Sequence, residues 1–152
     1  MVTEIIPLNS SHALPLVELY QQSSTEYSQH FRPFSFDIDT LIKILCKRER
    51  DLFFVILVEG EVAGFYMLRG FDEGYAVPCY GIWIAEKYSG QGLARMTLEH
   101  AISVCKKLGS SVLMLKVHPD NIRARQLYEK FGFKQTGIDT KNNNMIFNLM
   151  LS

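Results

Sequence analysis

Apolar runs of strand length alternate along this chain with segments whose apolar residues recur every three to four positions. Strand-like runs, rich in β-branched and aromatic side chains, occupy seven stretches: Val2–Pro7, Leu52–Val58, Val62–Arg69, Tyr80–Ile84, Ser110–Val117, Phe133–Thr136 and Met145–Leu151. Their length and composition are typical of strands that are buried in a sheet. Glu59-Gly60-Glu61 predicts a tight hairpin turn between the second and third runs, because glycine supplies the backbone freedom that such a turn needs.

Four segments between these runs predict helices. Residues that favour a helix start stand before each of them: Ser10 or Ser11, Asp37 or Asp39, Gly92, and Asn121. The resulting order, β-α-α-β-β-β-α-β-α-β-β, predicts a mixed α/β fold. A length of 152 residues suits a single domain over residues 1–152.

The composition excludes several classes of protein. Hydrophobic residues make up 47% of the chain and aromatic residues 12%, which argues for a folded globule and against disorder. The formal net charge is zero, with 16 basic and 16 acidic residues, so no global basic field would recruit nucleic acid or an anionic membrane. We therefore expect neither of these partners.

Cysteine and histidine are scattered along the sequence. Cys46, Cys79 and Cys105 show no CxxC spacing, and an odd set of separated thiols is typical of a reduced, cytoplasmic protein. The four histidines are dispersed as well, so we expect no metal. The first residues show no basic segment followed by an apolar one, and no stretch has transmembrane length, which also favours the cytoplasm.

The stretch Tyr80–Leu98 carries the first chemical signal. An apolar strand leads through Ala85–Ser89 into Gly90-Gln91-Gly92-Leu93-Ala94-Arg95, where helical periodicity begins. The first N–H groups of a helix have no intrahelical acceptor and lie at the positive end of the helix dipole, and glycines let an anion approach the backbone. This turn therefore predicts a phosphate-binding site.

Two common phosphate-binding motifs do not fit this turn. A P-loop needs GxxxxGK[ST], and no Lys-Ser or Lys-Thr follows these glycines. A dinucleotide-binding fingerprint needs a third small residue, where Arg95 stands. It also needs an acidic residue about 20 positions later, where the region around Ser110 and Ser111 offers none.

Two segments instead resemble motifs of the GNAT family of N-acetyltransferases. Residues 88–95 are similar to its motif A, [QR]xxGx[GA]: Gly92 and Ala94 match the last two fixed positions, although Ser89 stands where Gln or Arg is usual. His118–Phe133 resembles its motif B, NxxAxxxYxxxGF, at Asn121, Ala124, Tyr128, Gly132 and Phe133. The resemblance runs from about Leu52 to the C-terminus. It implies a central mixed, mostly antiparallel sheet that splays between strands four and five and is flanked by about four helices.

The resemblance also implies a reaction and the residues that carry it. An acetyl group would move from acetyl-CoA, the acyl donor, to a primary amine by direct attack, with Tyr128 as the general acid that protonates the thiolate. Ile82 and Ile84 would pair with the pantetheine arm through their backbone, and residues 90–95 would hold the pyrophosphate. The full set of coenzyme-binding residues is Ile82, Trp83, Ile84, Gly90, Gln91, Gly92, Leu93, Ala94, Arg95 and Asn121.

Structural roles remain as alternatives for several of these residues. The ring of Tyr128 also suits packing on the apolar face of its helix, Asn121 also suits a helix cap, and Trp83 suits a core position. An acyl-accepting role for Cys79 is disfavoured, because no histidine or acid stands at a recognisable spacing from it.

The general base remains open. Members of the family often place a glutamate on the fourth strand, but Tyr75–Ile84 contains no carboxylate and no histidine, and Tyr80 is its only obvious titratable group. A water chain or a loop residue is the alternative, and the loop candidates are Asp72, Glu73, Glu86 and His118.

The acceptor is expected at the least family-like part of the chain. Aromatic faces, one arginine and nearby acids gather in the residues that we assign to it: Phe31, Arg32, Phe34, Asp72, Glu73 and Tyr80. This mixture favours a small-metabolite amine, such as an amino sugar or an amino-acid-like compound. A protein N-terminus or lysine, or an acyl-CoA-binding module without catalysis, is the alternative, and both a monomer and a homodimer stay open.

Overall fold

A single open sheet of seven strands organises the residues that the computed structural model describes, which are 2–29, 31 and 34–151. The strands are β1 (Thr3–Pro7), β2 (Leu52–Val58), β3 (Glu61–Arg69), β4 (Cys79–Ile84), β5 (Val112–Val117), β6 (Lys134–Ile138) and β7 (Met145–Met150). They lie in the order β1-β2-β3-β4-β5-β7-β6, and every neighbouring pair is antiparallel except β4 and β5. The predicted mixed, mostly antiparallel sheet is confirmed.

Five α-helices accompany the sheet in the described part of the chain: α1 (Ala13–Gln22), α2 (Thr25–Ser28), α3 (Ile38–Lys47), α4 (Leu93–Lys107) and α5 (Ile122–Lys130). The predicted helices are present, and α2 is an additional one whose single turn is too short to show a hydrophobic period. Two 3-10 turns, η1 (Ser10–His12) and η2 (Glu86–Tyr88), precede α1 and α4. Among the described residues, no helix is both long and apolar enough to cross a membrane.

Side-chain caps begin two of the helices as expected and a third differently. Asp37 caps α3 and Asn121 caps α5. The expectation that Ser10 or Ser11 caps the first helix is wrong, because the Asn9 side chain accepts the backbone N–H of Ser11 at 2.9 Å and opens η1, which continues into α1. Asn and Ser cap equally well, so adjacent candidates are not distinguished by sequence.

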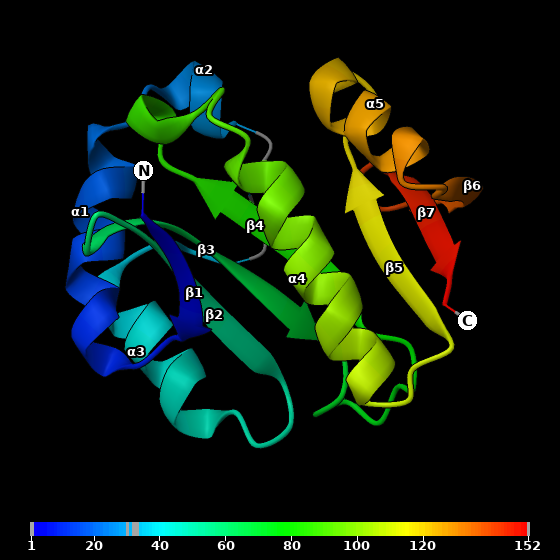
Figure 1. Cartoon of the computed structure of the whole chain (residues 1–152), viewed down its shortest axis with the longest axis horizontal. Coiled ribbons are helices and arrows are strands. Elements are labelled where there is room, and N and C mark those ends of the chain that lie inside the picture. Colours follow the sequence, from blue (N-terminus) through cyan, green and yellow to red (C-terminus); the bar gives the residue numbers. More distant parts are fainter. Residues whose placement is uncertain (1, 30, 32–33, 152) are drawn as a thin grey trace.

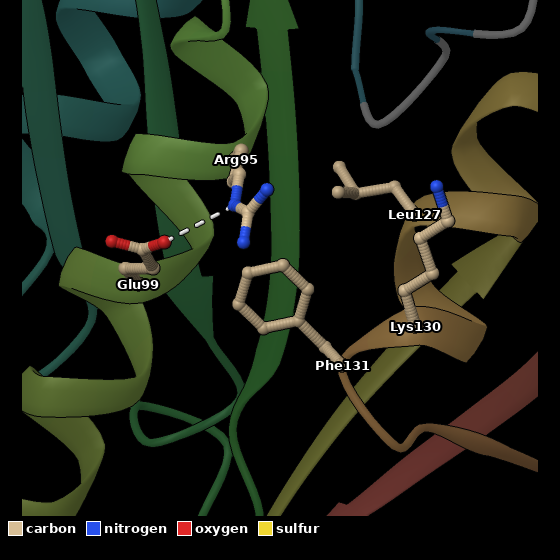
Figure 2. Close-up of a pocket in the computed structure, with 5 residues that line it drawn as sticks. All are labelled: Arg95, Glu99, Leu127, Lys130 and Phe131. Atoms are coloured by element: carbon tan, nitrogen blue, oxygen red, sulfur yellow. Dashed lines mark hydrogen bonds and ion pairs between the residues drawn. The ribbon is translucent and has the colours of Figure 1, made fainter.

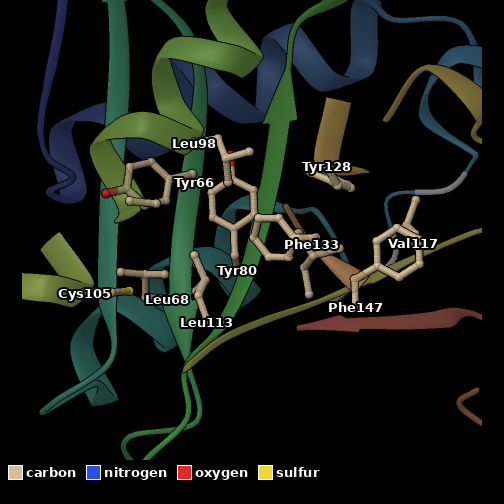
Figure 3. Close-up of a cluster of buried hydrophobic side chains, with 12 residues drawn as sticks. Tyr66, Leu68, Tyr80, Leu98, Cys105, Leu113, Val117, Tyr128, Phe133 and Phe147 are labelled. Atoms are coloured by element: carbon tan, nitrogen blue, oxygen red, sulfur yellow. The ribbon is translucent and has the colours of Figure 1, made fainter. Parts of the chain in front are cut away.

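Different helices cover the two faces of the sheet. Side chains alternate across a strand, so neighbouring residues of one strand meet different helices. Tyr66 and Tyr80 pack with residues of α4 and α5 in one buried cluster (Figure 3). Phe65 and Met67 pack with residues of α1 and α3 in another. α4 and α5 therefore share one face of the sheet.

β4 and β5 are paired only at the start of β4, with two residues in the middle of β5. Cys79 pairs with Met114 and Tyr80 with Leu115, and then the two strands separate, while residues 81–84 stay paired with β3 alone. Figure 1 shows β4 and β5 diverging towards their carboxyl ends. The splay predicted between strands four and five is confirmed.

Candidate functional site

The edge of β4 that faces β5 carries backbone groups without a strand partner. Ala85 donates its N–H to the Ala63 carbonyl of the β3 side at 2.8 Å, whereas the Pro78 carbonyl accepts the N–H of Met114 in β5 at 3.0 Å. Because these directions alternate along a strand, the N–H and C=O groups of Ile82 and Ile84 point towards β5. At these residues β5 has already separated from β4, so the edge is a template for an added extended segment.

The glycine turn follows this edge after the short η2 turn. Gly90 and Gly92 have φ of +77° and +81°, values that residues other than glycine rarely adopt. Gly92 is the N-cap of α4. No described side chain caps α4 there, and space is open on the side of both glycines where a Cβ would stand. The first N–H groups of α4, which include those of Leu93 and Ala94, are therefore accessible to an anion.

Arg95 lies in a shallow cavity between α4 and α5. Its Nε is 3.4 Å from a carboxylate oxygen of Glu99, and its guanidinium carbon is 6.0 Å from the centre of the Phe131 ring. Figure 2 shows this arrangement, with Leu127 and Lys130 completing a cavity of about 190 Å³. Two cations, one carboxylate and an aromatic face thus line the cavity, and one of the cations, Arg95, belongs to the first turn of α4.

Tyr128 and Tyr80 meet beneath α4 and α5 (Figure 3). Tyr128 is 8% exposed, with its ring centre 5.8 Å from that of Phe133, and burial raises the pKa of its phenol. Tyr80 is 4% exposed, and burial raises its pKa as well. Its hydroxyl has no hydrogen-bond partner within the described residues, and a buried polar atom without a partner is expected where a bound group or water supplies one.

Asn121 and Trp83 occupy structural positions. The Asn121 side chain accepts the N–H of Ala124 at 3.4 Å, so its oxygen caps α5 and only its amide nitrogen is left to meet a ligand. The Trp83 indole is 4% exposed and packs on the α1 and α3 face. Its backbone groups face β3, unlike those of Ile82 and Ile84 on either side.

Helix α2 reaches the same edge of β4, which the sequence did not indicate. The Tyr27 hydroxyl donates to the Ile84 carbonyl at 2.7 Å. The Trp83 Nε1–H donates to the Ser28 hydroxyl at 3.4 Å. The sequence could have indicated Ser24 as the N-cap of α2, because serine is a favoured N-cap residue. It could not have indicated the partner of Tyr27, because 57 residues separate the two groups.

The aromatic residues assigned to the acceptor lie on the other face of the sheet. Phe31 packs edge-on against Phe65 at 5.6 Å and belongs to the cluster that contains Trp83. Phe34 stacks on Phe36 at 6.1 Å, and the Arg69 guanidinium lies 5.5 Å above its ring. Tyr80 is on the opposite face with Tyr128, so the structure does not bring it to the phenylalanines. Arg32 lies outside the described residues.

Asp72 joins two loops. Its carboxylate accepts the backbone N–H groups of Glu49 at 3.1 Å and Arg50 at 2.5 Å, and its own N–H donates to the Asp51 side chain. Desolvation would raise the pKa of Asp72, but these N–H bonds outweigh it and lower the pKa. Glu73 is exposed on the same loop. The position of Asp72 therefore has a structural explanation that needs no substrate.

The other candidate bases lie in loops at the carboxyl ends of β4 and β5. Glu86 accepts the N–H of Ser24 at 3.0 Å, and His118 accepts the N–H of Asp120 at 3.1 Å. In residues 2–29, 31 and 34–151, no group of three or more His, Cys, Asp or Glu side chains is arranged to hold a metal ion.

Comparison with known proteins identifies relatives of this arrangement. The sequence model described as "Acetyltransferase (GNAT) family" matches residues 15–133. A [ribosomal protein bS18]-alanine N-acetyltransferase of Escherichia coli K12 is 35% identical over 91 residues, which cover 59% of this chain and 60% of the relative. An N-acetylaspartate synthetase of Xenopus tropicalis is 26% identical over 102 residues, which cover 67% of this chain and 38% of the relative. The match therefore spans less than two thirds of either relative.

A solved structure shares the whole fold. The PaiA N-acetyltransferase of Thermoplasma acidophilum, in complex with coenzyme A, aligns with a TM-score of 0.81 over 99% of both chains. Its sequence is 19% identical to this one, so the likeness concerns the fold.

Proposed function

The chain belongs to the acetyltransferase (GNAT) family, and on this premise we propose that it transfers the acetyl group of acetyl-CoA to a primary amine. One observation carries the proposal: the edge of β4 at Ile82 and Ile84 has no strand partner, and the short η2 turn connects it to the open N-terminus of α4 at Gly92. An extended amide-bearing arm and a pyrophosphate need these two sites side by side.

The residues present fit the coenzyme. Residues 90–95 would hold its pyrophosphate through backbone N–H groups, and Ile82 and Ile84 would pair with its amides. The orphaned hydroxyl of Tyr80 supports a bound group beneath α4 and α5. Bound acetyl-CoA supplies the thioester whose acyl carbon the amine attacks.

Tyr128 is proposed as the general acid. Its unperturbed pKa is about 10, and burial raises it further, so the phenol keeps its proton at neutral pH and can donate it to the departing thiolate. The amine must lose a proton before it attacks. Glu86 and His118 follow the carboxyl ends of β4 and β5, where the strands diverge, whereas Asp72 precedes β4, so we assign this step to Glu86, His118 or ordered water.

The acceptor is proposed to be a small-molecule amine. The names of the relatives differ on this point, since one acts on an alanine of a ribosomal protein and another is an N-acetylaspartate synthetase. A peptide N-terminus is the second candidate, favoured by the 35% identity with the first of them. A cytoplasmic location belongs to the same proposal, supported by three free cysteines.

Release of coenzyme A thiol tests the proposal. The full chain is mixed with acetyl-CoA and, separately, with an amino acid, an amino sugar, a polyamine and an alanine-starting peptide, and the acetylated product is identified by mass. We expect amine-dependent thiol release with at least one class. Tight coenzyme A binding in calorimetry without thiol release from any of them would favour a binding module instead.

A further inference from the structure

A row of side chains crosses the sheet on the face opposite α4 and α5. Arg69 pairs with Cys79, Cys79 with Met114, and Met114 with Asn148. Directly paired residues of neighbouring strands point to the same face. The row crosses β4 and β5 at their first pair, immediately below the point where they separate. Its side chains therefore lie close to the edge of β4 that is proposed to hold the coenzyme arm.

The charge on this face is positive. Lys116 belongs to it, because Leu115 and Val117 on either side are buried in the α4 and α5 cluster. Arg69 is paired directly with Cys79, and Lys116 is two residues beyond Met114, the other partner of Cys79. Burial raises the pKa of the Cys79 thiol, and the positive charges of Lys116 and Arg69 oppose that rise. The Lys116 ammonium is neutralised by Asp139 at 3.0 Å.

Arg69 has no such counterion. In the described part of the chain no carboxylate is within salt-bridge distance of it, and its guanidinium rests on the Phe34 ring. A guanidinium presents parallel N–H groups that match a carboxylate or a phosphate, and stacking on an aromatic ring holds its plane in place. Arg69 is thus an oriented anion-binding group on a partly exposed side chain.

Asn148 provides a second unsatisfied group in the same row. Its side-chain oxygen is buried and has no hydrogen-bond partner among the described residues. A carbonyl oxygen accepts from an N–H donor, such as an amine or an amide. Arg69 and Asn148 stand at opposite ends of the row, about 14 Å apart at three strand spacings, so the anion site proposed below consists of Arg69 alone.

We propose that the acceptor amine also carries an anionic group, a carboxylate or a phosphate, which Arg69 binds. The proposal rests on the acetyl transfer proposed above and specifies the acceptor. It replaces the expectation that Asp72 and Glu73 hold an ammonium group, because the Asp72 carboxylate already binds two backbone N–H groups.

Matched acceptors test the charge requirement. Thiol release from acetyl-CoA is measured with 4-aminobutanoate, its carboxamide and the corresponding aminoalkyl phosphonate, and with alanine and alaninamide. An anionic acceptor should be used at least about tenfold better in kcat/KM than its neutral amide, the value expected for one charge-assisted hydrogen bond. The phosphonate compared with the carboxylate tells which anion is preferred.

Arg69→Gln tests the residue. It should lower kcat/KM for the anionic acceptor roughly 10- to 100-fold, mainly through KM, and abolish the preference over the amide. Coenzyme A affinity by calorimetry should be unchanged. Lys134→Gln is the matched control, because Lys134 pairs with Asn148 from the edge strand and carries an exposed charge on the same face.

Three outcomes would overturn the proposal. Equal use of the anion and its amide by the wild type, or a preference for a polyamine, would show that the acceptor needs no negative charge, while acetyl transfer would stand. An equal loss in Lys134→Gln and Arg69→Gln would indicate a diffuse field instead of a binding residue. No thiol release with any amine would contradict the proposed function itself, and coenzyme A binding by calorimetry separates that result from an unfolded protein.

Discussion

At the scale of single residues, the hydrogen-bond partner of a buried hydroxyl group helps to distinguish a functional tyrosine from one that only packs in the core. The Tyr66 hydroxyl is 2.7 Å from Nδ1 of His100, so its polar atom is satisfied inside the protein. The Tyr80 hydroxyl has no partner in the described residues. Both phenols are enclosed by the same cluster, so burial alone does not tell a structural tyrosine from a functional one; the partner of the oxygen does.

Replacing Tyr128 by Phe tests the proposed acid. The ring and its packing against Phe133 are kept, so the variant should fold normally and bind acetyl-CoA like the wild type. Loss of general acid catalysis typically costs about 10²–10⁴-fold in rate, and at least tenfold should be lost in single-turnover acetyl transfer. Tyr75→Phe, at an exposed tyrosine, is the control. A full-rate single turnover in Tyr128→Phe would leave the residue a packing role only.

His100 should make stability depend on pH. Burial, with a smaller contribution from the Lys107 charge, lowers the pKa of His100 below its ordinary value of 6.5. The unfolded chain then binds more protons, so stability is fully present above about pH 6.5 and falls as the pH drops below it. Urea unfolding of His100→Gln at several pH values should show a shallower decrease than the wild type. Parallel curves would contradict this role.

At the scale of elements, two short segments control the candidate coenzyme site: the glycine turn before α4 and the single turn of α2. The turn places the first N–H groups of α4 beside the end of β4. α2 is attached to that end through Tyr27 and Ser28. Both segments act through backbone groups of β4 and α4, which explains why few side chains of the site are charged.

Gly92→Asp should weaken coenzyme A binding. The new carboxylate would stand at the anion site and repel phosphate, and we expect a loss of at least about tenfold in calorimetry, which corresponds to about 1.4 kcal/mol. Gly92→Asn is the control, because Asn has the same shape, tolerates positive φ and has no charge. Equal affinities in the Asp and Asn variants would show that repulsion plays no part.

Tyr27→Phe should loosen α2. It removes the hydrogen bond to the Ile84 carbonyl, and one such bond contributes about 0.5–1.5 kcal/mol. Trp83 is the only tryptophan of the chain and bonds to α2, so its fluorescence should become easier to quench with acrylamide. Tyr88→Phe, whose hydroxyl meets exposed Glu61, should leave the quenching unchanged. Unchanged quenching in Tyr27→Phe would mean that α2 does not depend on this bond.

At the scale of the whole molecule, the open sheet consists of two parts joined at one place. β4 and β5 share only two residue pairs, whereas the pairs β2–β3 and β5–β7 run along whole strands. The cluster beneath α4 and α5 contains residues of both parts, such as Leu68 of β3 and Phe147 of β7. Side-chain packing therefore holds the parts together where backbone pairing stops, and the open edge of β4 is preserved.

Global stability should not depend on disulfides. Cys46, Cys79 and Cys105 are free, and burial raises the pKa of Cys105 to about 11 and also raises that of Cys79, so both thiols stay protonated at neutral pH. The urea midpoint should be the same with and without reductant, and Cys79→Ala should keep its turnover. A folded Cys79→Ala protein that binds coenzyme A but does not react would require a covalent acyl-cysteine route.

Local patterns determined much of this molecule before any contact was known. The strand runs, the hairpin at Gly60, the cap at Asn121 and the order of elements follow from periodicity and turn chemistry, which are properties of neighbouring residues. The splay between β4 and β5 followed from the family resemblance of two short motifs. The anion-binding turn at Gly92 was also readable, because its geometry depends on the turn itself.

Only the tertiary structure decided which distant groups meet. Register across the sheet places Arg69 in one row with Asn148 and puts Tyr80 on the face of Tyr128, away from Phe34. In the folded chain the Asp72 carboxylate also connects its loop to the loop at Glu49, and the Tyr27 hydroxyl contacts the Ile84 carbonyl. Such contacts depend on strand register and helix docking over tens of residues, and the sequence around each partner carries no signal of the other.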